Sequence, residues 1–337
     1  MATKISFSLI LLLISNLSLL GQEIILKFNE DKKFKILQIT DTHFVSDDPR
    51  SEGTLKNIEK IMDIEQPDLV IYTGDLIYGK PAEVNLRQVL ETASERKIPF
   101  AVTFGNHDDE FDLNRSELYE IIRTIPYNLT CSTPDIHGIT NFTLPIFSST
   151  ASNNPRFTPI YILYCFDSNA YSVIENISGY DHIKYNQIDW YRRNSFNYRK
   201  QNNNTPIPSL AFFHIPLPEF SDATSDTNTI LTGTRKEKVC SPQINSGLFA
   251  TIKELGDIKG VFVGHDHDND YAVYWKNILL AYGRYSGGNT VYNNLKPSGA
   301  RIIELSENEE GFYTWIRLIN GDIIHKIKYP DFFLKSN

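Results

Sequence analysis

The chain has 337 residues, of which 41% are hydrophobic and 12% aromatic. That composition excludes a disordered chain and is sufficient for a domain with a large core. Acidic residues outnumber basic ones, 41 against 33, and the formal net charge is -8. We therefore expect no nucleic-acid partner, because nucleic-acid binding needs a basic face for the phosphates.

The N-terminus is typical of a secretory signal peptide. Lys4 precedes a run over residues 5–20 that is apolar apart from Ser and Asn, and Gly21 offers a small residue near a cleavage point. The continuous apolar part is short for a membrane span, although an uncleaved anchor is the alternative. We expect a signal peptide over 1–21, one domain over 22–337, no membrane attachment after cleavage, and a secreted or periplasmic protein.

The first two thirds of the chain alternate between apolar strands and amphipathic helices. Near-continuous apolar strands between helices predict a sheet that is covered on both faces, as in α/β proteins. Helices are expected around Leu55–Met62, Leu86–Ala93 and Leu118–Ile125, and over 185–199 and 245–255. The expected strands are 34–40, 68–74, 99–105, 160–166, 209–215 and 260–264.

After residue 270 the pattern changes to short β-rich stretches that follow one another, such as "ILLAYG" and "FYTWIRL". They predict a second, more antiparallel sheet packed on the first. The segment 221–242 is rich in Ser, Thr and Asn and reads as a long loop, and long loops in compact domains are often functional.

Polar side chains follow five of the apolar strands, at the edge of an open α/β sheet where ligands bind. A single Asp or His at such a place is usually a cap or a core residue, but five in order favour a metal site. Imidazole and carboxylate groups without thiolates suit divalent or trivalent first-row metals. The groups are Asp41-Thr42-His43, Asp75, Asn106-His107-Asp108, His214 and His265-Asp266-His267.

The series D-x-H, G-D, G-N-H-D, H and G-H-x-H resembles the calcineurin-like metallophosphoesterase superfamily, and most closely its single-domain branch related to purple acid phosphatases. The resemblance runs from about residue 34 to 285. It implies an α/β fold in which two mixed sheets form a four-layer α/β/β/α sandwich. It also implies two metal ions, drawn from Fe, Mn or Zn.

By this resemblance, the two metals share Asp75, whose two carboxylate oxygens can span a pair of ions. One metal would also take Asp41, His43 and His267. The other would also take Asn106, His214 and His265.

The resemblance also assigns residues beside the metals. It makes His107 the general acid, with Asp108 as its orienter, and Arg284 is a weaker candidate for holding phosphate oxygens, the alternative being a surface arginine. Purple acid phosphatases have Gly at the position of His43 and bind iron through the tyrosine that corresponds to Tyr78. We expect His43 to bind and Tyr78 to lie nearby unbound. Asp266 is expected to point away into solvent or to cap a turn.

The resulting hypothesis is a secreted phosphatase that hydrolyses small phosphate monoesters by attack of a hydroxide that bridges the metals. A phosphodiesterase on the same site is the alternative, and a non-catalytic metal-binding protein is a third possibility. Cys165 lies in an apolar run and is expected to be buried, whereas Cys131 and Cys240 lie in loop-like sequence and could pair. The sequence leaves the oligomeric state open.

Overall fold

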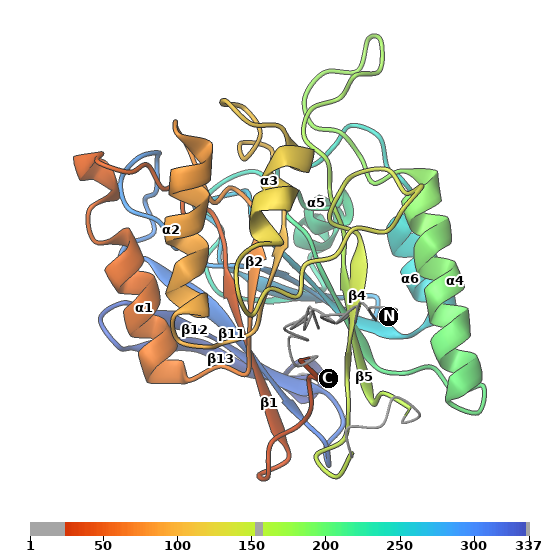
Figure 1. Ribbon diagram of the computed structural model, residues 1–337. Coiled ribbons are helices and arrows are strands. Elements are labelled where there is room, and N and C mark those ends of the chain that lie inside the picture. The colour runs from red at the N-terminus through yellow and green to blue at the C-terminus, as the bar shows by residue number, and fades with distance from the viewer. Residues whose placement is uncertain (1–23, 152–157, 335–337) are drawn as a thin grey trace, which may run out of the picture.

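The computed structural model describes residues 24–151 and 158–334. The expected signal peptide lies outside the described residues. Two mixed β-sheets face each other, with helices on their outer faces (Figure 1). The expected four-layer α/β/β/α sandwich of two mixed sheets is therefore confirmed.

The first sheet has six strands, and β1 lies in its interior between β2, which is parallel to it, and β11, which is antiparallel. The strands in spatial order are β13 (Ile323–Tyr329), β12 (Phe312–Leu318), β11 (Gly299–Ser306), β1 (Lys33–Ile39), β2 (Leu69–Thr73) and β3 (Phe100–Thr103).

The second sheet has seven strands, and its centre is the parallel set β5, β6, β8 and β10. The strands in spatial order are β4 (Phe142–Ile146), β5 (Tyr161–Cys165), β6 (Ser209–Phe212), β8 (Ile258–Val263), β10 (Ile278–Tyr282), β9 (Ala272–Trp275) and β7 (Ile230–Thr232).

The expectation that the strands after residue 270 form a sheet of their own was wrong. β9 and β10 extend the sheet of β8, whereas β11, β12 and β13 return to the sheet of β1. The segment 221–242 is also not wholly a loop, because it contains the end of α5 and the edge strand β7.

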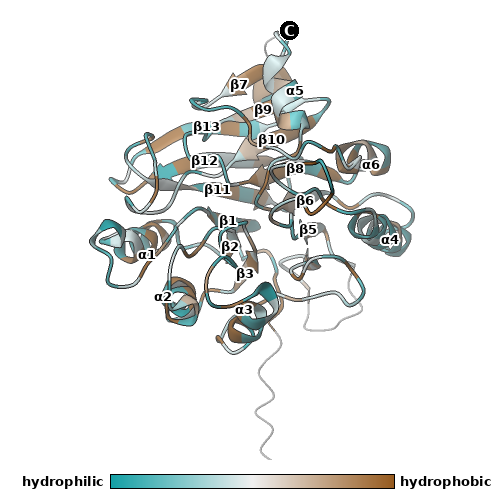
Figure 2. Cartoon of the chain, turned by 90° about the horizontal axis from the view of Figure 1, so that it is seen from above, coloured by the Kyte–Doolittle hydropathy of each residue, from teal (hydrophilic) through white to brown (hydrophobic). Residues whose placement is uncertain are grey.

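Helices cover the outer faces of both sheets, α1 to α3 over the first and α4 and α6 over the second (Figure 2). The helices are α1 (Thr54–Glu65), α2 (Ala82–Ser94), α3 (Arg115–Ile122), α4 (Tyr185–Gln201), α5 (Glu219–Ser225), α6 (Leu248–Leu255) and α7 (Asp331–Leu334). Among residues 24–151 and 158–334, no helix has the length and apolar character that a bilayer span needs.

Alternation along the strands explains the layers. In β1, Ile36 packs into the core between the sheets, while its neighbour Leu37 packs into the core under α1 and α2. Successive side chains of a strand point to opposite faces, so a strand buried on both sides must be apolar throughout. Buried Gln38 is the exception, and its Nε2 donates to Val263 O of the other sheet at 3.0 Å. This bond ties the sheets together just before the polar strand ends.

Candidate metal centre

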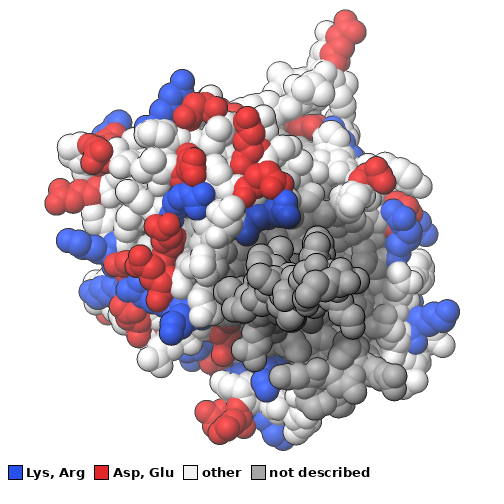
Figure 3. Space-filling model, in the orientation of Figure 1, with Lys and Arg blue, Asp and Glu red and all other residues white. Residues whose placement is uncertain are grey.

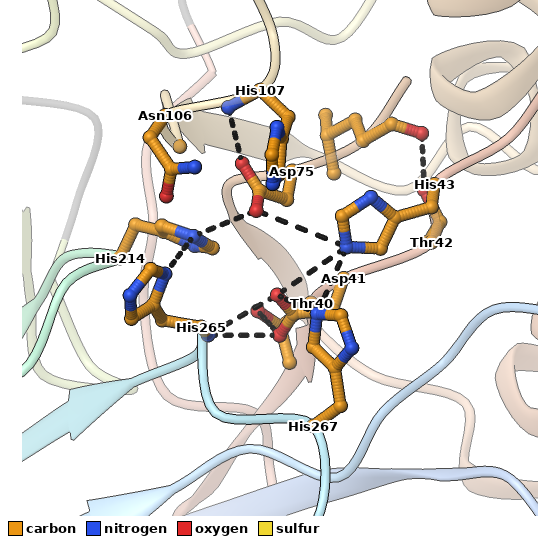
Figure 4. A network of polar contacts seen from close by, with 12 residues as sticks. Thr40, Asp41, Thr42, His43, Asp75, Asn106, His107, His214, His265 and His267 are labelled. Atoms are coloured by element: carbon orange, nitrogen blue, oxygen red, sulfur yellow. Dashed lines mark hydrogen bonds and ion pairs between the residues drawn. The ribbon is translucent and has the colours of Figure 1, made fainter. Parts of the chain in front are cut away.

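The polar residues that follow β1, β2, β3, β6 and β8 converge on one buried space between the two sheets (Figure 4). The pairing register brings the strand ends level, with Thr73 opposite Thr103 in the first sheet and Phe212 opposite Phe262 in the second. Five separate segments therefore supply one centre, as the strand-end pattern predicted.

Tight backbone approaches allow this convergence. Gly74 has φ of 84°, and a Cβ at Gly105 would lie 2.1 Å from Asp75 Oδ1, so no larger residue fits there. Asp41, Asp75 and His265 also adopt positive φ values, of 54°, 52° and 80°. Such conformations are costly for residues with side chains and cluster at functional sites.

The first group of candidate ligands is Asp41, His43 and His267, all buried. His43 Nε2 lies 3.0 Å from His267 Nε2 and 3.9 Å from Asp41 Oδ1. It also lies 3.8 Å from Asp75 Oδ2, so the Asp75 carboxylate reaches toward this group from its neighbour.

The second group is Asp75, His214 and His265, also buried. His214 Nε2 lies 3.0 Å from Asp75 Oδ2 and 3.2 Å from His265 Nδ1. The Asn106 side chain lies beside this group (Figure 4), and its Oδ1 is buried with no hydrogen-bond donor among the described residues. The structure thus brings all seven expected ligand residues together and leaves Asp75 between the two groups.

Hydrogen bonds on the far side of two rings set their tautomers. His214 Nδ1 lies 2.7 Å from Thr73 O, and His267 Nδ1 lies 2.9 Å from Tyr292 O. A carbonyl oxygen only accepts, so both Nδ1 atoms donate, and each Nε2 of the neutral ring presents a lone pair to the centre. This is the arrangement by which proteins orient histidine for a metal ion.

The electrostatics also favour cations. Burial lowers the pKa of His43 and His265 well below their usual range, so both rings are neutral donors of lone pairs. Burial alone would lower the pKa of His214, but the adjacent Asp75 charge outweighs it and raises that pKa to about 9. A space lined by acceptors that draws a proton onto His214 attracts positive charge, and these residues fit a pair of metal ions.

His107 stands at the edge of this centre. Its backbone N donates to Asp75 Oδ1 at 2.8 Å, and its ring lies 5.5 Å from that of His43. The His107 side chain is 27% exposed, unlike the buried candidate ligands, and its Nδ1 lies 2.6 Å from Glu110 Oε2. The carboxylate accepts from Nδ1, which leaves Nε2 as the ring atom available to another molecule.

The expected pairing of Asp108 with His107 was wrong. Asp108 is buried, and its carboxylate accepts hydrogen bonds from the backbone N of Asp75, Leu76, Ile77 and Gly105. Asp108 therefore holds the loops after β2 and β3 together. Its side chain is directed inward to these backbone groups and not toward the His107 ring. Glu110, one turn further on, takes the place beside His107.

Arg284 is also not placed as expected. It is buried, not at the surface, and it donates to the Asp270 carboxylate and to Pro297 O. A guanidinium held on both sides by protein is not free to bind phosphate.

Asp266 likewise does not point into solvent. Its Oδ2 accepts from the Tyr282 hydroxyl at 2.6 Å, and the Cys240 backbone N also donates to this carboxylate. Burial raises the pKa of Asp266 to about 7. Asp266 thus anchors the segment around Cys240 beside the centre.

Tyr78 lies close to the centre. Its ring packs edge-on against His43 at 5.3 Å and against His107 at 5.1 Å, and it is 37% exposed. Cys131 and Cys240 are both free thiols, and Cys165 is buried as expected.

Sequence reasoning missed Glu110 and Tyr171. Glu110 lies three residues after His107 in "HDDE". With three acids in a row, the sequence does not indicate which of them contacts the His107 ring. The Tyr171 hydroxyl lies 2.7 Å from Glu110 Oε1, although the two residues are 61 positions apart in the chain. No local pattern could have indicated that contact.

Comparison with known proteins places the chain among phosphoesterases. Residues 34–269 match the family model described as calcineurin-like phosphoesterase. The probable inactive purple acid phosphatase 29 of Arabidopsis thaliana is 32% identical over 322 residues, 86% of this chain and 81% of that protein. Phosphatase DCR2 of Saccharomyces cerevisiae is 35% identical over 334 residues, 88% of this chain and 55% of the yeast protein.

Solved structures agree on the fold. A dimetal phosphatase from Danio rerio superposes with a TM-score of 0.59 at 10% identity, covering 88% of this chain and 98% of that one. GAP50, described as the anchor in the inner membrane complex of Plasmodium, gives a TM-score of 0.51 at 13% identity, covering 88% of each chain. From the match of the family model and the similarity to the curated relatives over most of the chain, this protein belongs to the calcineurin-like phosphoesterase family.

Proposed function

We propose that this protein is a phosphomonoesterase that works with two metal ions and acts on small phosphorylated molecules outside the cytoplasm. The observation that carries the proposal is the pairing of two complete groups of buried ligands, joined by Asp75, with a partly exposed histidine at their edge. The family provides the reaction class, and the N-terminal run over 5–20 supports export.

The residues have separate tasks in this proposal. Bound metal ions would supply an acidic water as the nucleophile and positive charge opposite the phosphoryl oxygens. Asp75 spans the two groups, and Asp108 fixes the loop that carries Asp75 through its backbone bonds. His107, with Nδ1 held by Glu110, delivers a proton from Nε2 to the departing oxygen.

Several relatives carry names that call them inactive, including the probable inactive purple acid phosphatases 14 and 29 of Arabidopsis thaliana. Others do not, such as Phosphatase DCR2. In this chain every position of the five-part motif is filled, and His107 has a carboxylate partner. These features favour catalysis over metal binding alone.

A metal analysis combined with a substrate panel tests the proposal. We expect two metal equivalents per chain and a higher kcat/KM for an alkyl or aryl phosphate than for the matching diester. A preference for the diester would instead support the phosphodiesterase. Two bound metals without hydrolysis of any ester would contradict catalysis, and no bound metal would contradict the centre itself.

Export is tested separately. N-terminal sequencing of the protein from its native host should give a chain that starts near residue 22. Intact Met1 in the cytosolic fraction would contradict it.

A further inference from the structure

The segment between β5 and α4 forms a hairpin that projects from the molecule at the top of Figures 1 and 3. Tyr171 and Tyr180 pair across it as an antiparallel bridge, and their rings stack at 5.8 Å. Ser172 N donates to Gly179 O, which closes the ladder. The base of the hairpin is therefore ordered, and it places Tyr171 against residues of the metal centre.

The Tyr171 hydroxyl contacts two such residues. It lies 2.7 Å from Glu110 Oε1 and 3.1 Å from Asn106 Nδ2. Its one proton goes to the carboxylate, which can only accept, so the hydroxyl oxygen must accept from its other neighbour. That neighbour is consequently the NH₂ end of the Asn106 amide.

This direction has a consequence for Asn106. With its NH₂ group held by Tyr171, its carbonyl Oδ1 is directed inward, where it is buried and has no donor among the described residues. A flipped amide would present N–H groups, which do not bind a cation. The same hydroxyl also holds Glu110, whose other oxygen contacts His107 Nδ1 at 2.6 Å.

We propose that Tyr171 is a positioning residue that uses one hydroxyl group to orient both the Asn106 amide toward the second metal position and the Glu110 carboxylate against His107. The inference rests on the proposed function and adds the hairpin to the machinery. Tyr171 itself touches neither metal nor substrate in this role. Partners of this kind typically change metal affinity or activity by about 10–100-fold when they are removed.

The test uses Tyr171→Phe, which removes the hydroxyl and keeps the ring. Its matched control is Tyr180→Phe in the same hairpin, which likewise removes a hydroxyl and keeps a ring. The Tyr180 ring stacks on Tyr171 and packs edge-on against His265 at 4.3 Å, and both ring contacts remain in this variant. Metal-free protein is titrated with Zn²⁺ in a calorimeter. We expect Tyr171→Phe to weaken one of two binding steps by about 10–100-fold and to leave the other unchanged. Tyr180→Phe should match the wild type in both steps.

Kinetics at saturating Zn²⁺ then test the second contact of the Tyr171 hydroxyl, the one with Glu110. For Tyr171→Phe, kcat should fall more on an alkyl phosphate than on nitrophenyl phosphate, with KM nearly unchanged, because only the poor leaving group needs the proton from His107. Glu110→Gln should show the same kinetic pattern with both metal steps intact, which separates the two contacts even if Tyr171→Phe folds poorly.

The outcomes distinguish the two proposals. Wild-type protein that binds no Zn²⁺ or hydrolyses neither ester refutes the proposed function. An active wild type whose Tyr171→Phe variant keeps both binding steps and the same ratio of alkyl to aryl kcat refutes the positioning role alone.

Discussion

Buried carboxylates occur at both ends of the parallel strands, and the surroundings of Asp75 at the C-terminal end differ from those of Asp257 at the N-terminal end. At the N-terminal end of β8, Asp257 accepts from the Tyr191 hydroxyl at 2.5 Å and from Ile258 N at 2.9 Å. At the C-terminal end of β2, Asp75 Oδ2 is buried without a hydrogen bond to a described residue and lies among the ring nitrogens of His43 and His214.

Glu65 extends the comparison to the first sheet. It lies near the start of β1, and it accepts from Trp315 Nε1 at 3.0 Å and from Arg317 Nε at 2.6 Å. A buried carboxylate surrounded by donors is a structural element, complete in itself. A buried carboxylate oxygen among other ligand atoms is complete only with a cation. Asp75 Oδ2 is of this kind, whereas Asp108 and Asp266 at the same end are held by donors, so the difference marks the metal centre.

The change that should break this contrast most strongly is Asp75→Asn. It keeps the shape but removes the charge and one of the two oxygens that span the groups, so we expect loss of most bound metal and of all measurable phosphatase activity. Elemental analysis and a kinetic assay check both. Full occupancy of both metals in this variant would show that Asp75 does not join them.

His107→Ala sharpens the contrast within the metal end, because His107 is partly exposed and belongs to neither ligand group. Both metals should remain bound. Activity on an alkyl phosphate should fall by ~10²–10⁴-fold, with a smaller loss on nitrophenyl phosphate, whose oxygen leaves without a proton. Loss of metal together with activity would make His107 a ligand, and equal losses on both esters would make it a residue that binds phosphate.

Removal of the metals by a chelator should lower the thermal stability of the protein, because the ligands at the metal end then lose their cations. Ligand binding to the folded state contributes about 2.7 kcal/mol at a metal concentration of 100 Kd. We therefore expect the Tm to fall by several degrees and to recover when metal is added back. The Tm of Asp75→Asn, which should hold little metal, should change little on adding the chelator. A Tm that ignores the chelator, in protein shown to have held metal, would contradict the idea that the acceptors at this end depend on a cation.

At the opposite end, Tyr191→Phe removes one donor from Asp257. Leaving a buried carboxylate short of a donor costs about 1–3 kcal/mol, so chemical denaturation should show a lower free energy of unfolding. Metal content and kcat should match the wild type. If this variant instead lost metal, the two ends would be coupled and the comparison would fail.

The strand-end ligands were predictable because an apolar run indicates a buried strand, and the C-terminal ends of such strands lie at the edge of the sheet where ligands bind. Asp75 directly follows "VIYTG", so its position needs little more than that rule. The side chains further into a loop were not predictable in this way, as Asp108 and Glu110 show, five and seven residues after the end of β3 at Thr103. Asp108 and Glu110 differ in direction because of a turn after Asn106 that the residue types do not dictate.

Partners distant in sequence were equally hidden. The short β-rich stretches after residue 270 correctly indicated strands, but a strand's own sequence does not say which sheet it will join. The Arg284 guanidinium donates to Asp270 and to the carbonyl of Pro297, and these partners are brought to it by the pairing of the surrounding strands. The partners around His107 were not predicted for the same reason, since Tyr171 comes from the segment that follows β5 and contacts Glu110.

The interior position of β1 has a consequence for how the protein is made. β1 carries Asp41 and His43 at its end, and one of its two neighbours is β11, with Lys33 opposite Ser306. During synthesis, β1 must wait for more than two hundred further residues, including the whole second sheet, before that neighbour leaves the ribosome. Contacts of such separation fold slowly. The centre can therefore mature only late, after the second sheet has been synthesised, and until then its histidines are open to stray metal ions.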